Sequence, residues 1–173
     1  MAKSVQALLP LIAAIGFLSF LGFAMCDETL FIEGQVYCDT CRTAFVTKAS
    51  NLIEGAKVAL NCRDRAAGDL TYSLEGVTDS TGSYKLAVEG DHEEEICEIK
   101  LISSPREDCN ETIPGLDNAR VLVTSNNGIS ELSRFVNSLG FLKKEPLPEC
   151  HEILRGMGMV PAMIPTSVKE PSA

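Results

Sequence analysis

The 173-residue sequence predicts an all-β fold, arranged as an antiparallel β-sandwich or β-barrel. Three observations predict this class. Short runs rich in β-branched and aromatic residues recur along the chain, and turn-forming residues separate them. Only one stretch has apolar residues at a mixed, non-alternating spacing. Cysteines are spread over nearly the whole chain after residue 26, which in a secreted protein indicates a disulfide framework.

Each predicted strand combines β-forming residues with at least partial alternation of apolar and polar positions. The predicted strands are residues 31–38, 56–62, 70–74, 83–89, 96–103 and 119–124. The run 79–82 (DSTG) consists of turn formers and suits a hairpin that leads into the strand at 83–89. The strand at 119–124 (ARVLVT) has the continuous apolar character of a buried strand.

Two segments near the C-terminus depart from the strand pattern. Residues 129–142 (ISELSRFVNSLGFL) carry the mixed apolar spacing, which allows either a short helix ending near Gly140 or an irregular cover over one end of the barrel. After Cys150 the chain contains three prolines among small residues. We therefore expect residues 151–173 to form a flexible tail, with little fixed structure past Pro161.

The first 26 residues have the features of a secretory signal peptide. Lys3 is the only charged residue before Asp27, and an apolar run fills most of the segment between them. Cleavage before Asp27 divides the chain into a signal peptide at 1–26, a domain at 27–150 and the tail. It also removes Cys26, so that six of the seven cysteines remain. The alternatives are cleavage after Ala24 and an uncleaved membrane anchor.

The charge balance excludes some classes of partner. The chain has 15 Lys+Arg against 24 Asp+Glu, for a net charge of −9. Nucleic-acid binding requires clustered cations that replace the counterions of phosphate, and anionic lipid surfaces attract basic segments. We therefore expect no nucleic-acid partner, and no membrane association once the signal peptide is removed.

Cys38 and Cys41 form a C-x-x-C motif. This motif occurs in redox proteins, where a strand enters a helix of a βαβ unit. Here both flanks have the pattern of strands, so a structural disulfide is the favoured interpretation. A zinc site needs a second close pair of ligands, and the two histidines, His92 and His151, are isolated. We expect no metal and no cofactor.

Residues 91–95 (DHEEE) form the densest charge cluster. A hard cation such as calcium prefers carboxylate ligands, but the segment lacks the spaced Asp/Asn and Gly of an EF-hand loop. Consecutive carboxylates more often form a solvated loop, which is the favoured interpretation here.

The sequence contains no catalytic motif of a known kind, neither G-x-S-x-G, nor a P-loop, nor H-E-x-x-H. Two carboxylates that meet only in the folded state remain compatible with glycoside hydrolysis. The absence of Trp weakens the case for a sugar-stacking cleft. The single N-x-S/T sequon, at Asn110, is predicted to carry an N-linked glycan on a loop.

Residues 33–42 (EGQVYCDTCR) resemble the opening of the Ole e I pollen allergen/extensin-like family. The resemblance continues through residues 55–58 (GAKV), 82–84 (GSY) and 139–141 (LGF), and ends with 146–150 (PLPEC). It covers about residues 31–150, with all six cysteines in the family's order. The anther- and pollen-specific members are the most similar.

The resemblance implies a secreted β-barrel or β-sandwich with three disulfides. In family members the first cysteine pairs with the fifth, the second with the sixth and the third with the fourth. Carried onto this chain, the pairs are Cys38–Cys109, Cys41–Cys150 and Cys62–Cys97. A wider similarity to prealbumin-like Greek-key sandwiches concerns the fold alone.

The family also implies a function. Its members are secreted by pollen and other plant tissues, act in the extracellular matrix, and are linked to pollen hydration and tube growth; many are allergens. Proposed ligands are cell-wall polymers and the ectodomains of receptor kinases. We therefore expect a non-enzymatic extracellular binding protein located in the extracellular space or cell wall. The alternative is a secreted hydrolase or inhibitor acting on wall polymers.

Overall fold

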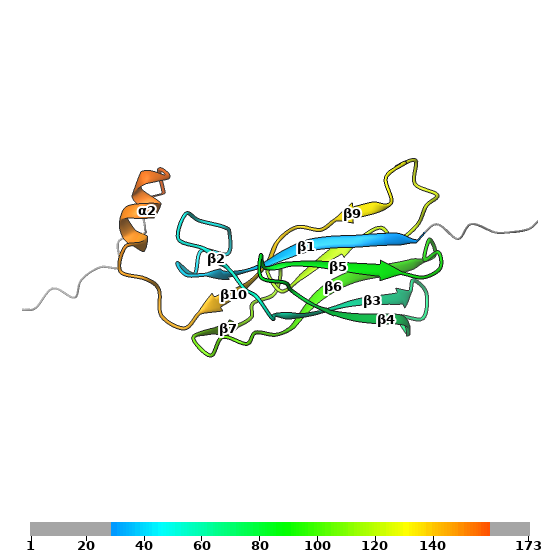
Figure 1. Ribbon diagram of the computed structural model, residues 1–173, viewed down its shortest axis with the longest axis horizontal. Helices are drawn as coiled ribbons and strands as arrows, with labels where there is room; N and C mark the ends of the chain where they lie inside the picture. The colour runs from blue at the N-terminus through cyan, green and yellow to red at the C-terminus, as the bar shows by residue number, and fades with distance from the viewer. Residues whose placement is uncertain (1–28, 160–173) are drawn as a thin grey trace, which may run out of the picture.

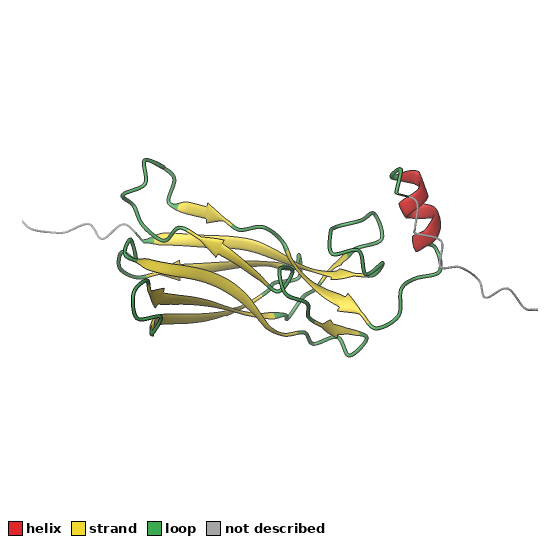
Figure 2. Cartoon of the chain, turned by 180° about the vertical axis from the view of Figure 1, so that it is seen from behind, coloured by secondary structure: helices red, strands yellow, loops and turns green. Residues whose placement is uncertain are grey.

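The computed structural model describes residues 29–159. The predicted signal peptide at 1–26 and the end of the predicted tail lie outside the described residues. Within them, the chain forms two facing β-sheets and one short helix (Figures 1 and 2). The predicted all-β class is confirmed, and the sheets form a sandwich rather than a closed barrel. No helix in residues 29–159 is long and apolar enough to cross a membrane.

The strands divide unequally between the two sheets. The four-stranded sheet has the order β4 (Leu70–Val77), β3 (Lys57–Asp64), β6 (Glu95–Ser103) and β8 (Asn118–Val121). The six-stranded sheet has the path β2 (Asn51–Leu52), β1 (Leu30–Asp39), β10 (Leu139–Lys143) and β7 (Cys109–Glu111), with β5 (Ser83–Val88) and β9 (Ser133–Phe135) also paired to β1. The helix α2 (Cys150–Gly156) lies at one end of the molecule (Figure 1).

Alternation along the strands builds the core between the sheets. In β5, Tyr84, Leu86 and Val88 are buried while the residues between them are exposed. In the opposite sheet, Leu60 of β3 and Ile99 of β6 are paired in register and fully buried. Burial of a side chain of this size stabilises the fold by roughly 1.5–3 kcal/mol.

The strand β1 changes its partners halfway along its length. Its first half pairs antiparallel with β5 and parallel with β9, whereas from Val36 onward it pairs with β10 and β2. The exchange occurs beside Gly34, where the ring of Tyr84 from β5 occupies the space that a side chain would need. A cavity described below lies at this exchange.

Residues 129–142 form neither the short helix nor the irregular cover that their spacing allowed. The segment contributes β9 and β10, and both run parallel to β1, so the six-stranded sheet is mixed rather than antiparallel. Residues 139–142 are all buried. A strand covered on both faces has apolar residues at consecutive positions, so the two-residue alternation by which strands are predicted is lost.

Two further details of the prediction are wrong. The turn at 79–82 does not close a hairpin, because β4 and β5 belong to different sheets and the turn carries the chain from one to the other. Residues 118–121 form an edge strand with alternating exposed and half-buried positions, not a buried strand. Both errors have one cause, since local sequence does not specify which strand becomes the neighbour of which.

The helix α2 occupies the start of the segment expected to be a flexible tail. Only Cys150 of its seven residues is buried. Glu152 lies in the first turn and Arg155 in the last, where their charges complement the helix dipole. A helix this short is not stable by itself in water, so its position depends on Cys150.

Candidate functional site

Three disulfides connect distant parts of the described chain: Cys38–Cys109, Cys41–Cys150 and Cys62–Cys97. They are the same three pairs that the family resemblance implied. Cys38 and Cys41 bond to different partners, so the C-x-x-C motif is not a closed redox pair in this structure. Cys62 and Cys97 face each other directly across β3 and β6.

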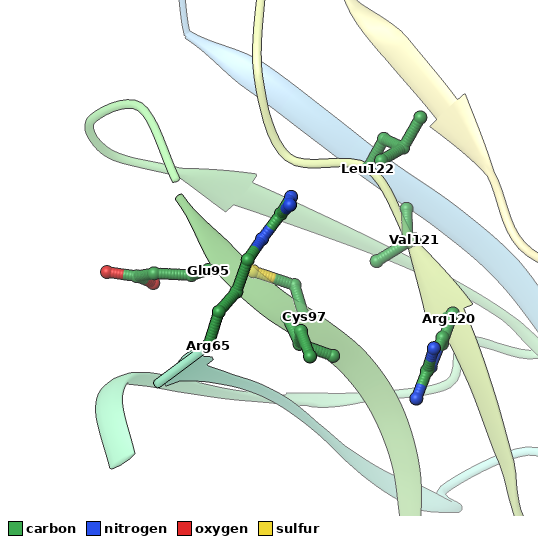
Figure 3. Close-up of a pocket in the computed structure, with 7 residues that line it drawn as sticks. Arg65, Glu95, Cys97, Arg120, Val121 and Leu122 are labelled. Carbon is green, nitrogen blue, oxygen red and sulfur yellow. The ribbon is translucent and has the colours of Figure 1, made fainter. Parts of the chain in front are cut away.

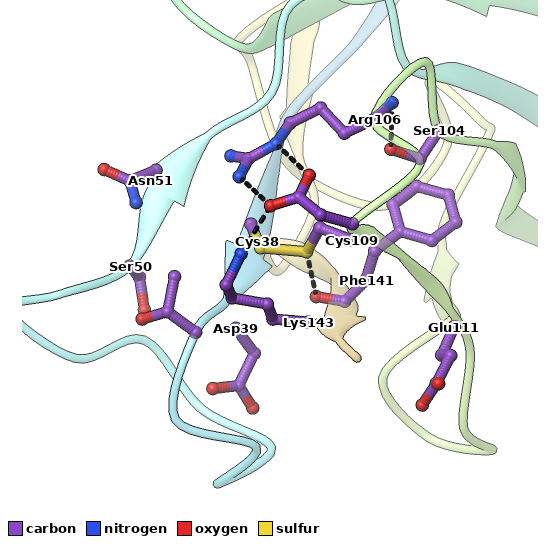
Figure 4. Close-up of a disulfide and its surroundings, with 12 residues drawn as sticks. Cys38, Asp39, Ser50, Asn51, Ser104, Arg106, Cys109, Glu111, Phe141 and Lys143 are labelled. Carbon is purple, nitrogen blue, oxygen red and sulfur yellow. Dashed lines mark hydrogen bonds and ion pairs between the residues drawn. A yellow bond between two sulfur atoms is a disulfide. The ribbon is translucent and has the colours of Figure 1, made fainter. Parts of the chain in front are cut away.

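An ion-pair cluster lies beside the Cys38–Cys109 bond (Figure 4). Asp108 accepts hydrogen bonds from Arg106, at 2.9 Å, and from Lys143 of β10. These bonds hold the pKa of the Asp108 carboxyl well below its usual range, and the bond from Arg106 has the larger effect. The cluster joins the loop before β7 to β10 and reinforces the link made by the disulfide.

The acidic segment 91–95 connects two loops. Asp91 accepts a hydrogen bond from the hydroxyl of Thr124 at 3.0 Å, and the side chain of Glu93 accepts one from Asn126 at 3.1 Å. The carboxylates of Asp91 and Glu93 therefore have separate partners on the loop after β8, whereas that of Glu95 contacts His92. The segment thus holds its own loop against the loop after β8 through side-chain hydrogen bonds, whereas the sequence predicted a solvated loop.

His92, one of the isolated histidines, is held on both sides of its ring. Its Nδ1 lies 2.8 Å from a carboxylate oxygen of Glu95, and its Nε2 lies 3.1 Å from the backbone carbonyl of Glu89. The ring also packs against Tyr72, with the ring centroids 4.6 Å apart. These contacts fix the ring between Glu95, Glu89 and Tyr72.

One cavity, of about 390 Å³, lies at the ends of β3, β6 and β8 (Figure 3). Its charged side chains already have partners: Glu95 contacts His92, Arg65 donates to the carbonyl of Glu93 at 2.9 Å, and Arg120 donates to Glu98 at 3.0 Å. Glu95 also lies close to the sulfurs of Cys62 and Cys97. Those sulfurs form a disulfide, so they offer no thiolate to a metal.

A second cavity, of about 420 Å³, opens where β1 exchanges its partners. Two carboxylates line it, Glu33 and Asp79. The ammonium of Lys85 contacts Glu33 at 2.7 Å and lowers its pKa, and the hydroxyl of Thr81 is the main cause of the lowered pKa of Asp79. A general acid for glycoside hydrolysis requires a raised pKa. Neither carboxylate therefore has the raised pKa that the general acid of this reaction needs.

The predicted glycosylation site, Asn110, lies in β7 rather than in a loop. Its side chain is exposed, and its neighbour Cys109 is buried in the disulfide to Cys38. β7 pairs only with β10 among the described strands, so it forms an edge of the sheet. An exposed position on an edge strand is accessible to solvent.

Sequence reasoning missed three side chains that the fold makes prominent. Phe135 is 74% exposed on β9, while the hydroxyl of Tyr84 is buried with no hydrogen-bond partner. Arg134 is buried, and it donates to the backbone carbonyls of Thr124 and Glu131, which holds the loop between them against β9. Arg134 is buried and Phe135 is exposed, which is the alternation of a strand. The mixed spacing of the apolar residues around them hides this alternation in the sequence.

The fold and its covalent links define a class: a small β-sandwich stabilised by three disulfides. The family model "Pollen protein Ole e 1 like" matches residues 28–158. The chain belongs to this family. The family expectation drawn from the sequence is therefore confirmed.

Individual relatives agree with this assignment. The chain is 53% identical to an Olee1-like protein of Betula pendula, over 93% of this chain and 97% of the relative. It is 46% identical to the anther-specific protein LAT52 of Solanum lycopersicum, over 93% and 98%. The crystal structure of the major plantain pollen allergen Pla l 1 is similar, with a TM-score of 0.63 and 38% identity over 70% of this chain and 99% of that chain. The second and third are named as an anther-specific protein and a pollen allergen, and none of the three names states an enzyme activity.

Proposed function

We propose that this protein is secreted and acts without catalysis, by binding an extracellular macromolecule during pollen hydration and pollen-tube growth. The names of its relatives support a role in pollen, and its three disulfides suit an oxidising compartment. The observation that carries a binding role is a group of exposed apolar side chains on one strand and the loop before it: Ile129, Leu132 and Phe135. Apolar side chains exposed close together mark sites of interaction with a protein or a ligand.

The proposed partners are a receptor-kinase ectodomain or a cell-wall polymer. A rigid sandwich reduces the entropy lost on binding, because the surface is already ordered before the partner arrives. A stable fold of this kind would also make the protein a potential allergen. Catalysis is disfavoured because Glu33 is paired with Lys85 and both ring nitrogens of His92 have hydrogen-bond partners within the fold.

The test uses the protein as plant cells secrete it. Immobilised oxidised protein is exposed to the extracellular fluid of growing pollen tubes, and a reduced, alkylated sample serves as the control. We expect a receptor ectodomain or a wall polymer to be retained by the oxidised form only. Equal retention by both forms, or release of sugar from wall polymers by the purified protein, would overturn the proposal.

We also propose that Asn110 carries an N-linked glycan. Its exposed position on β7 makes the side chain accessible to the modifying enzyme. Endoglycosidase treatment is expected to lower the mass of the secreted protein, and the Asn110→Gln variant is expected to show no such decrease. A wild-type mass that treatment leaves unchanged would contradict the assignment.

A further inference from the structure

The cavity at the partner exchange of β1 has an aromatic wall. β9 ends at Phe135 and β10 begins at Leu139, and Val136 and Ser138 of the short connection line the cavity together with Gly34. Phe135 has the largest exposed fraction of the large apolar side chains in residues 29–159. One wall of the cavity is therefore an aromatic side chain that is largely free to contact a ligand.

The other walls are polar, and part of their hydrogen-bonding capacity is unused. Asp79 accepts its three bonds, from Thr81 and Ser83, through Oδ1, and its Oδ2 makes none among the described residues. Gln35 makes only one long contact, 3.4 Å from its Nε2 to the hydroxyl of Ser83. Both the acceptor of Asp79 and the amide of Gln35 remain available to a ligand.

The charged residues around the cavity indicate which ligand charge it favours. Glu33 and Asp79 contribute two negative charges, and Lys85 contributes one positive charge that is paired with Glu33. The lining is thus net negative, which disfavours an anionic ligand. Hydroxyl groups both donate and accept hydrogen bonds, so an uncharged polyol satisfies such a mixed lining.

A buried hydroxyl marks the same place. Tyr84 is 3% exposed, its hydroxyl has no hydrogen-bond partner within residues 29–159, and that oxygen lies directly over Gly34, which lines the cavity. Burial raises the pKa of the Tyr84 hydroxyl, so it keeps its proton as an available donor. Buried polar groups without partners are rare in folded proteins, and they commonly indicate a missing water or ligand.

We propose that this cavity binds a neutral sugar residue, with the apolar C–H face of the sugar on Phe135 and its hydroxyls on Asp79 and Gln35. The site deepens the proposed binding function and rests on it, because it selects an uncharged polysaccharide as the partner. An aromatic face with convergent polar groups is the usual composition of a small-ligand site. The Tyr84 hydroxyl would donate to the ligand or to a water beneath it.

The test is titration of the isotopically labelled secreted protein, followed by amide NMR. The probes are neutral tetrasaccharides of β-1,4-linked glucose, xylose and galactose, with tetragalacturonate as the charged comparison. We expect saturable shifts around residues 33–35 and 135–138 with at least one neutral probe. Tetragalacturonate is expected to bind at least about tenfold more weakly, a difference of about 1.4 kcal/mol.

Matched variants identify the site. Phe135→Ala is expected to weaken binding at least about tenfold, and Phe135→Tyr is expected to retain it. Ile102→Ala removes an exposed apolar side chain of β6, which belongs to the other sheet and does not line the cavity, so its affinity should equal that of wild type. Because Phe135 and Ile102 are both exposed, we expect these variants to fold, and unchanged amide spectra of the core strands check this.

Either of two outcomes would overturn the proposal: no neutral probe shifts these residues, or Phe135→Ala binds like wild type. The proposed function is separable from these results. If Phe135→Ala still retains its extracellular partner in the capture experiment, the binding function stands and the sugar site is wrong. If wild-type protein captures no partner and binds no probe, both are wrong.

Discussion

The two ends of the molecule combine apolar burial and covalent links in different proportions. The sandwich contains one cluster of nineteen buried residues shared by both sheets. The end that carries β2, β7, β10 and α2, which we call the disulfide end, adds a second cluster of only Tyr37, Leu116 and Leu142, and it contains the bonds Cys38–Cys109 and Cys41–Cys150. The large cluster extends into this end through β7 and β10, and the two covalent links supplement an apolar core that becomes smaller there.

The largest expected effect is in the sandwich core. Leu60→Ala removes a fully buried side chain that faces both β4 and β6, and it should lower the free energy of unfolding by about 2–5 kcal/mol. Urea unfolding measures the change. Ile102→Ala, at a side chain that is 49% exposed on β6, is the control and should cost less than about 0.5 kcal/mol. Similar losses for both variants would refute the picture of a core-stabilised sandwich.

The disulfide end is tested by removing one bond. Replacing Cys41 and Cys150 together by serine should lower the free energy of unfolding by about 2–4 kcal/mol. Hydrogen exchange should show the loss of protection concentrated in α2, because Cys150 is the only buried residue of that helix.

The matched control is the double serine variant of Cys62 and Cys97. These two residues already face each other in a hydrogen-bonded pair of strands, so we expect a smaller cost that is spread over β3 and β6. If α2 kept its protection without Cys150, the helix would be docked by contacts other than the disulfide.

A smaller effect is expected at Gly140, in the disulfide end. A Cβ at this position would lie 2.8 Å from the ring of Tyr37 and 3.1 Å from Leu116. Gly140→Ala should therefore cost about 1–3 kcal/mol through overpacking, measured by thermal or urea unfolding. Gly156→Ala, in α2, has no atom within 4 Å of the added Cβ and should be neutral or slightly stabilising. A neutral Gly140→Ala would show that the small cluster can move aside.

The smallest effect concerns acid. Because Arg106 and Lys143 lower the pKa of Asp108 in the folded state, the carboxylate stabilises the fold above the unfolded pKa, near 3.8. That contribution is lost as the pH falls through the folded pKa. Unfolding midpoints of wild type and Asp108→Asn should thus differ most above pH 4 and converge in stronger acid. Glu107→Gln, at the exposed neighbouring residue, should follow the wild-type curve; a constant offset for Asp108→Asn would refute the linkage.

The residue pattern predicted the strands that have one buried and one exposed face. β5 and β6 alternate clearly, and their predicted ranges agree with the structure. β10 was missed because four of its five residues are buried, which leaves no alternation to detect. β2, β7 and β9 are two or three residues long, too short for any periodicity. Their strand conformation depends on pairing with β1 or β10.

The candidate site was the least predictable part. Gly34, Asp79, Tyr84 and Phe135 come from four separate segments, and each has an ordinary role when read locally: a strand glycine, a turn aspartate and two β-forming aromatics. Only the partner exchange of β1 brings them to one cavity. The acidic segment 91–95 is a similar case, because its partners Thr124 and Asn126 lie about thirty residues away.

The sequence by itself determined the all-β class, the main alternating strands and, through its family resemblance, the cysteine pairs Cys38–Cys109, Cys41–Cys150 and Cys62–Cys97. These properties follow from local periodicity and from the order of the residues. Only the tertiary structure decided that β9 and β10 run parallel to β1, that the turn at 79–82 joins two sheets, and that an orphaned hydroxyl and an exposed ring share a cavity. The physical reason is that strand pairing is non-local: a strand's pattern specifies which face it buries, whereas its neighbour is chosen by the packing of the whole chain.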